Sequence, residues 1–85
     1  GKPIWEARAE VDLVLKKFEV TRFESLKWTA EFSVSSPSAV QARCQFKPRG
    51  ALAVIGPFNF PLHLVMGHMI PALATGNSVV LKPSP

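Results

Sequence analysis

The sequence contains one cysteine, Cys44, among 85 residues, so no disulfide bond can form within the chain. Proteins without disulfides are typical of reducing compartments, and we expect a cytoplasmic protein. The sequence also has no run of about 20 apolar residues, which is the length of a membrane-spanning helix. The opening residues lack the apolar segment of a signal peptide. We therefore expect no membrane partner.

Clustered charge and metal-binding patterns are missing as well. The ten Lys and Arg residues exceed the six Asp and Glu residues, giving a net charge of +4, but they are scattered along the chain. Nucleic-acid-binding surfaces gather basic side chains on one face, so we expect no nucleic-acid partner. His63 and His68 are five residues apart in an expected helix and lie on different faces. We expect no metal, because no cysteine or carboxylate nearby completes a site.

Glycine-rich nucleotide motifs, internal repeats and low-complexity segments are also absent, since neither GxGxxG nor GxxxxGKS/T occurs. The composition is globular, with 47% hydrophobic and 19% charged residues. A domain of this length buries only about 60–65% of its surface and is marginally stable alone. Neither end resembles the polar linker that usually bounds a domain. We therefore expect residues 1–85 to be a partial domain of a longer chain.

The first segment, residues 4 to about 30 within 1–32, has the pattern of a long helix. Pro3 stands where proline is tolerated near a first turn, and the acidic Glu6 and Glu10 favour the positive end of the helix dipole. Apolar residues recur at the spacing of one helix face, which we expect to pack against a core. That face consists of Val11, Val14, Leu15 and Phe18, extended by Thr21, Ser25 and Trp28.

The next segment changes from a loop to a strand. Serine and proline in SVSSPSA, residues 33–39, predict a loop. Residues 39–47 predict a strand, because VQARCQFK alternates apolar and polar side chains, which indicates one buried face and one wet face. Cys44 lies on the apolar face, where we expect a buried structural thiol. The alternation is typical of an antiparallel or edge strand that can pair with another chain.

Residues 51–82 predict a strand–helix–strand unit. The apolar run ALAVI, residues 51–55, has the length of a strand that is covered on both faces. A helix follows over 61–75, with Pro61 near its first turn and Gly76 at its end. The run SVVLK, residues 78–82, predicts a second apolar strand. Such a unit pairs its strands in parallel, so the expected fold class is α/β.

Polar groups follow both of these strands. Because the carboxyl ends of parallel strands meet at one sheet edge, an amide, a cation, a hydroxyl and a helix N-terminus converge there, which suits an anionic, phosphate-bearing ligand. Two simpler interpretations stay open: Asn59 as the N-cap of the helix, and Lys82 as a solvated strand end. The residues concerned are Gly56, Pro57, Phe58 and Asn59 after the first strand, and Lys82, Pro83 and Ser84 at the end of the second.

The stretch RGALAVIGPFNFPLHLVMGHMIPALATGNSVVLKPSP resembles the first half of the Rossmann-like coenzyme-binding domain of the aldehyde dehydrogenase superfamily. The resemblance rests on NFP after the first strand, PALATGN at the helix end and KPS after the second strand. The opening GKPIWEARAEV is similar to the long helix that precedes this domain in the family. Within the superfamily, WEAR, GPFNFP and GHMIPAL are most similar to N-succinylglutamate 5-semialdehyde dehydrogenases of bacterial arginine breakdown.

The resemblance implies roles for individual residues. Asn59 matches the asparagine that donates its side-chain N–H to the oxygen of the thiohemiacetal, which forms when a cysteine thiolate attacks an aldehyde. Lys82 matches the lysine that binds the adenosine ribose, with Ser84 close by. Pro85 stands where NAD-preferring members often have a glutamate that would repel a 2′-phosphate, so its absence leaves NADP as an alternative to the NAD that we expect. The residues that match the coenzyme-site lining at the strand end are Ile55, Gly56, Pro57 and Phe58.

The resemblance also implies what the intact protein does. It would oxidise an aldehyde to a carboxylate as a homo-oligomer, with a catalytic cysteine and a general-base glutamate beyond residue 85. Cys44 is not that cysteine, because it precedes the nucleotide fold on a strand of the family's oligomerisation sheet. We expect residues 1–85 alone to be catalytically inert. Two alternatives remain: an acylating, coenzyme A-dependent dehydrogenase of the same fold, and a non-catalytic assembly module that pairs through strand 39–47.

Overall fold

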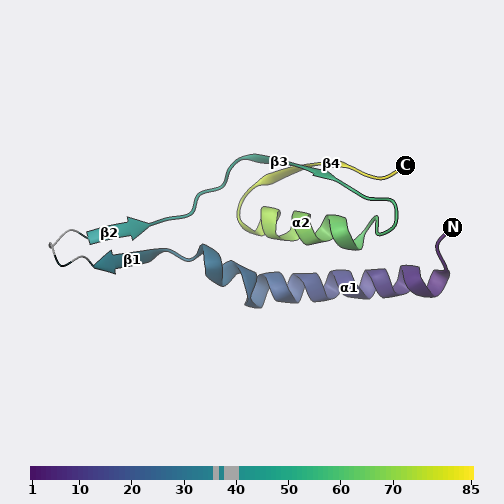
Figure 1. Ribbon diagram of the computed structural model, residues 1–85, viewed down its shortest axis with the longest axis horizontal. Coiled ribbons are helices and arrows are strands. Elements are labelled where there is room, and N and C mark those ends of the chain that lie inside the picture. Colours follow the sequence, from purple (N-terminus) through teal and green to yellow (C-terminus); the bar gives the residue numbers. More distant parts are fainter. Residues whose placement is uncertain (36, 38–40) are drawn as a thin grey trace.

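The computed structural model describes residues 1–35, 37 and 41–85 (Figure 1). Helix α2 lies between helix α1 and a sheet of β3 and β4, while a hairpin of β1 and β2 extends away from the other elements. The mixed α/β class expected from the sequence is confirmed. In chain order the elements are α1 (Ile4–Phe23), a 3₁₀ helix η1 (Ser25–Thr29), β1 (Phe32–Ser35), β2 (Gln41–Cys44), β3 (Ala51–Ile55), α2 (His63–Ala74) and β4 (Ser78–Lys82).

The strand–helix–strand unit forms as the sequence predicts. Strands β3 and β4 pair in parallel, in a register that runs from Ala51 opposite Ser78 to Ile55 opposite Lys82. Helix α2 connects them and packs on the sheet through Val65. The helix begins at His63, two residues later than expected, and ends at Ala74. The parallel pairing places both strand ends at the same edge of the sheet.

The long helix is shorter than the prediction and packs on a different face. It ends at Phe23, and η1 follows it where the sequence pattern continues the helix to about residue 30. Residues Glu10, Val14 and Thr21 are buried, at the i, i+4, i+11 spacing of one face that meets α2. The expected apolar face is therefore wrong, because only two of its members, Val14 and Thr21, are buried. Of its other members, Ser25 is half-buried, and four are half or more exposed: Val11, Leu15, Phe18 and Trp28.

The expected loop at 33–39 is wrong in its first part, because Phe32–Ser35 forms β1. This strand pairs antiparallel with β2, with Phe32 opposite Cys44 and Ser35 opposite Gln41. Glu31 supports the pairing, since its carboxylate accepts from Arg43 Nε at 2.8 Å and from Gln45 Nε2 at 2.7 Å. The expected strand 39–47 is reduced to Gln41–Cys44, and its residues 39 and 40 lie outside the described residues.

The burial expected for the strands is wrong in two places. Only one face of the β3–β4 sheet is covered, by α2, so Val54 is buried while Ile55 and Val80 are exposed. Cys44 is half-buried instead of buried, because the hairpin packs on no other element in the described part of the chain. Among the described helices, none has both the length and the apolar character that crossing a bilayer needs.

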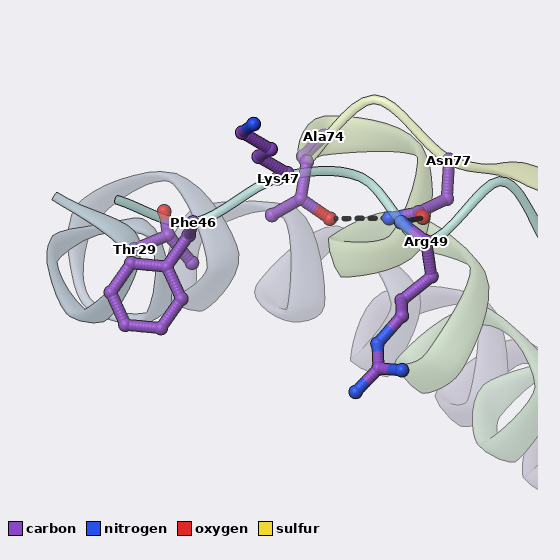
Figure 2. Close-up of a pocket in the computed structure, with 7 residues that line it drawn as sticks. Thr29, Phe46, Lys47, Arg49, Ala74 and Asn77 are labelled. Atoms are coloured by element: carbon purple, nitrogen blue, oxygen red, sulfur yellow. Dashed lines mark hydrogen bonds between the residues drawn. The ribbon is translucent and has the colours of Figure 1, made fainter. Parts of the chain in front are cut away.

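The Asn77 side chain joins the start of β3 to the end of α2 (Figure 2). Its Oδ1 accepts from the backbone N–H groups of Arg49 at 2.6 Å and Gly50 at 3.1 Å. Its Nδ2 donates to the Ala72 carbonyl at 3.2 Å and to Thr75 Oγ1 at 3.0 Å. One amide thus fixes the start of β3 against the end of α2, directly before β4 begins, and stabilises the β3–β4 register.

We predict that Asn77→Ala lowers the free energy of unfolding by about 1–3 kcal/mol, because four hydrogen bonds lose their partner. The measurement is the urea midpoint of the complete gene product, with Gln41→Ala as a control for an exposed amide on β2. Equal midpoints for the two variants would contradict this role of Asn77.

Candidate functional site

The parallel strands β3 and β4 end side by side. Their last paired residues are Ile55 and Lys82, and the Gly56 backbone N–H donates to the Lys82 carbonyl at 2.9 Å. A side chain at Gly56 would clash with α2, because a Cβ there would lie 2.8 Å from Val65 Cγ2, and it would also come into contact with the Ser84 nitrogen at 3.6 Å. The missing side chain therefore lets the two strand ends and α2 meet at one edge.

This edge exposes a cation, a hydroxyl and apolar surface. Ile55 is 75% exposed and Phe58 is 84% exposed. Lys82 is exposed, and its ammonium makes a long contact of 3.5 Å to the Pro83 carbonyl. Ser84, two residues after Lys82, is half-buried. These groups fit a nucleotide, whose hydroxyls accept from an ammonium and whose rings pack on apolar side chains. The same exposure agrees with Lys82 as a solvated strand end.

Asn59 lies in the turn between β3 and α2. Asn59 is exposed, and it borders a hollow of about 380 Å³ together with Lys2, Glu6 and Phe58. The lining of that hollow does not include Lys82 or Ser84. The interpretation of Asn59 as a helix cap is wrong, because the N-cap position of α2 is Leu62.

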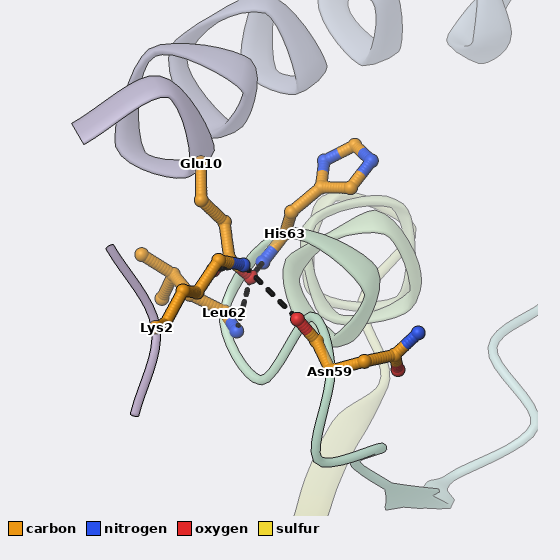
Figure 3. Close-up of polar contacts among 5 residues, drawn as sticks. All are labelled: Lys2, Glu10, Asn59, Leu62 and His63. Carbon is orange, nitrogen blue, oxygen red and sulfur yellow. Dashed lines mark hydrogen bonds and ion pairs between the residues drawn. The ribbon is translucent and has the colours of Figure 1, made fainter. Parts of the chain in front are cut away.

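The cap of α2 comes from another helix (Figure 3). Glu10 of α1 accepts through one oxygen, Oε1, from the backbone N–H groups of Leu62 at 2.9 Å and His63 at 2.7 Å. These are donors that the first turn of a helix leaves without an internal partner. A carboxylate also interacts favourably with the positive end of the α2 dipole. Glu10 is only 4% exposed, so this charge is held inside the structure.

Lys2 completes the cluster around Glu10. Its ammonium donates to Glu10 Oε2 at 2.8 Å and to the Asn59 carbonyl at 3.0 Å. The same nitrogen lies 4.3 Å from the centroid of the Phe60 ring, within the range of a cation–π contact. Figure 3 shows the backbone carbonyl of Asn59 turned toward Lys2 and its side-chain amide pointing away from Lys2. The turn at 59–60 is therefore attached to the start of the chain.

Comparison with known proteins decides the family. The sequence model of the aldehyde dehydrogenase family matches residues 1–85. This chain belongs to the aldehyde dehydrogenase family.

Three curated relatives in this family carry the name N-succinylglutamate 5-semialdehyde dehydrogenase. They come from Novosphingobium aromaticivorans (49% identical), Sphingopyxis alaskensis (46%) and Chromobacterium violaceum (45%), each over 84 residues. Each alignment covers 99% of this chain but only 18%, 18% and 17% of the respective relative. The chain thus spans less than a fifth of the length of the curated relatives it matches.

Two residues that hold the start of α2 in this aldehyde dehydrogenase chain, Glu10 and Lys2, were not predicted from the sequence. In the sequence, Glu10 is explained by the dipole of its own helix, and Lys2 is one of the scattered basic residues. Neither pattern indicates a contact with α2. The need for a cap from another segment appears only in the structure, where the N-cap position falls on Leu62, whose side chain cannot accept a hydrogen bond. His63 Nδ1 is buried and has no hydrogen-bond partner among the described residues, which no pattern indicated either.

The environment of Glu10 lowers its pKa below the ordinary value of 4.5. Burial by itself raises the pKa, but the hydrogen bonds from Lys2, His63 and Leu62 and the charge of Lys2 outweigh it. The folded protein therefore holds Glu10 as a carboxylate more strongly than the unfolded chain does. This difference stabilises the fold fully above the unfolded pKa and is lost as the pH falls through the folded pKa.

We predict that the free energy of unfolding of the complete gene product falls as the pH drops below about 4.5, and that Glu10→Gln removes part of this dependence. The measurement is the urea midpoint of unfolding between about pH 3 and pH 7, a range that spans the ordinary carboxylate pKa of about 4. Glu19→Gln on the exposed side of α1 is the matched control. An identical pH slope in the Glu10→Gln variant would contradict the assignment.

Proposed function

We propose that this chain supplies the oxyanion donor and part of the coenzyme site of a cytoplasmic, NAD(P)-dependent aldehyde dehydrogenase. Its proposed substrate is N-succinylglutamate 5-semialdehyde, in the breakdown of arginine. The observation that carries the proposal is the family match over residues 1–85, in which Asn59 stands in an exposed turn beside a hollow. Identities of 45–49% to relatives named for this substrate support the substrate class.

The role of Asn59 follows from the charge that develops in aldehyde oxidation. When a cysteine thiolate attacks the aldehyde carbon, the carbonyl oxygen gains a negative charge. An amide N–H that is already directed at that oxygen stabilises the charge more in the transition state than in the substrate. Asn59 offers such a group. Its backbone carbonyl is held by Lys2, and its side-chain amide points to the other side of the turn.

The β3–β4 edge fits the coenzyme. When bound, NAD(P) supplies the acceptor for the hydride that leaves the aldehyde carbon. Lys82 and Ser84 would hold the hydroxyls of its adenosine ribose, while the exposed Ile55 and Phe58 would pack on its apolar parts. Pro85 brings no carboxylate that would repel a 2′-phosphate, so the edge accommodates NAD and admits NADP.

The nucleophile of this reaction is a residue outside this chain. Cys44 belongs to the β1–β2 sheet, which is a different sheet from the one that carries the proposed coenzyme edge. The hairpin instead suits contact between subunits of a homo-oligomer. Phe32 and Val34 on β1 are both more than half exposed, and outer strand edges have backbone groups available for pairing.

We predict that the complete gene product reduces NAD with N-succinylglutamate 5-semialdehyde, and that Asn59→Ala lowers kcat about 10²–10³-fold. The measurement is NADH formation at saturating coenzyme, for this aldehyde and for simple aliphatic aldehydes. Gln41→Ala serves as a control for loss of an exposed amide. No turnover with any aldehyde would overturn the proposal, and turnover that requires coenzyme A would indicate the acylating reaction.

We predict that Lys82→Ala raises the KM for the coenzyme about tenfold, because it removes a charged hydrogen-bond donor from the ribose. The KM for the aldehyde should change little, since the lining of the hollow beside Asn59 does not include Lys82. Steady-state kinetics with coenzyme and aldehyde varied separately make the distinction, with Lys47→Ala as the control for an exposed lysine. A rise in the aldehyde KM alone would contradict the assignment.

A further inference from the structure

The turn that carries Asn59 has little local support. Asn59 precedes the N-cap of α2 by three residues, so the hydrogen bonds of the helix do not include its backbone. It follows β3 by four residues, and the register with β4 ends at Ile55. The position of its amide therefore depends on contacts made by other segments.

Those contacts converge on one buried carboxylate. Glu10 Oε1 holds the backbone of Leu62 and His63, on the C-terminal side of the turn. Glu10 Oε2 holds the Lys2 ammonium, which in turn binds the Asn59 carbonyl and lies over the Phe60 ring. Both oxygens of one side chain thus act on the same five-residue stretch, 59–63.

A buried carboxylate restricts this arrangement more tightly than an apolar contact would. Glu10 is 4% exposed, and leaving such a charge without its partners is strongly unfavourable. Lys2 keeps 21% of its side chain exposed, so it can adjust while Glu10 cannot. Displacing the turn would break hydrogen bonds at both ends of the stretch together, which favours one position for the Asn59 peptide.

We infer that Glu10 is a positioning residue for aldehyde oxidation, which with Lys2 holds the turn that presents the Asn59 amide to the oxyanion. The inference rests on the proposed function for its catalytic consequence. Oxyanion donors act only within a narrow range of distance, and a displacement of about 1 Å can cost up to about 10²-fold in rate. Glu10 touches neither substrate nor coenzyme, and it acts through Asn59.

The test is a double-mutant cycle in the complete gene product. The variants are Glu10→Ala, Asn59→Ala and both together, with Glu19→Gln as a control on the same helix. Glu10→Ala should lower kcat about tenfold and leave the KM for the coenzyme nearly unchanged. In the Asn59→Ala background, the same substitution should change kcat by less than about twofold, because the group through which it acts is gone. An equal loss of kcat in both backgrounds would overturn the inference.

A second variant separates positioning from folding. Glu10→Gln keeps an oxygen that can accept from Leu62 and His63 but places an amide N–H against the Lys2 ammonium. It should lower kcat less than Glu10→Ala and should also lose its effect in the Asn59→Ala background. If Glu10→Ala does not fold, the cycle with Glu10→Gln decides the question, and a kcat equal to that of the parent protein would contradict the inference.

A structural readout distinguishes this inference from the proposed function. If the parent protein oxidises no aldehyde, the proposed function fails, and crystal structures of the parent protein and Glu10→Gln then test the positioning alone. We expect the Asn59 amide to be displaced or poorly ordered in the variant and unchanged in Glu19→Gln. An Asn59 amide in the same place and equally ordered in both variants would overturn the inference.

Discussion

The arrangement depends on the buried carboxylate of Glu10, which joins α1 to the first turn of α2. Helix α2 has no cap of its own, since Leu62 stands at its N-cap position. The carboxylate supplies the missing acceptor, and Lys2 neutralises its charge and binds the neighbouring turn. A charge this deeply buried is tolerated because every oxygen has a partner. Removing either partner would leave an unpaired buried group and loosen the junction between the helices.

The regular part of the fold could be predicted, because it depends on local pattern. ALAVI, PALATGN and SVVLK carry the length and punctuation of a strand, a helix end and a second strand, and the parallel pairing follows from the short helical connection. Strand β1 could not be predicted, since Phe32–Ser35 is short and serine-rich and becomes a strand only through pairing with β2. The packed face of α1 also escaped prediction, because a buried Glu10 counts as polar in any hydrophobic pattern.

The candidate site, like the fold, could be predicted from the sequence only in part. Asn59 and Lys82 could be named as candidates because residues after parallel strands lie at one sheet edge and because the surrounding motifs resemble a known family, and their roles stay predictions. The hydrogen bonds that hold Asn59 were not found, because Lys2 and Glu10 lie about fifty residues away in the sequence. Nothing in a linear pattern connects a lysine at the start of the chain to a turn at 59–60. Such tertiary caps become visible only when the backbone donors are traced to their acceptors.

The measurement that tests this account most directly is amide hydrogen exchange of Leu62 and His63 in the complete gene product at neutral pH. Both N–H groups lie in the first turn of α2, where amides without a partner exchange quickly. The account predicts slow exchange at both positions in the parent protein and fast exchange in Glu10→Ala, with Glu19→Gln unchanged. Fast exchange at both amides in the parent protein would contradict it, because Glu10 would then not hold the helix that the turn precedes.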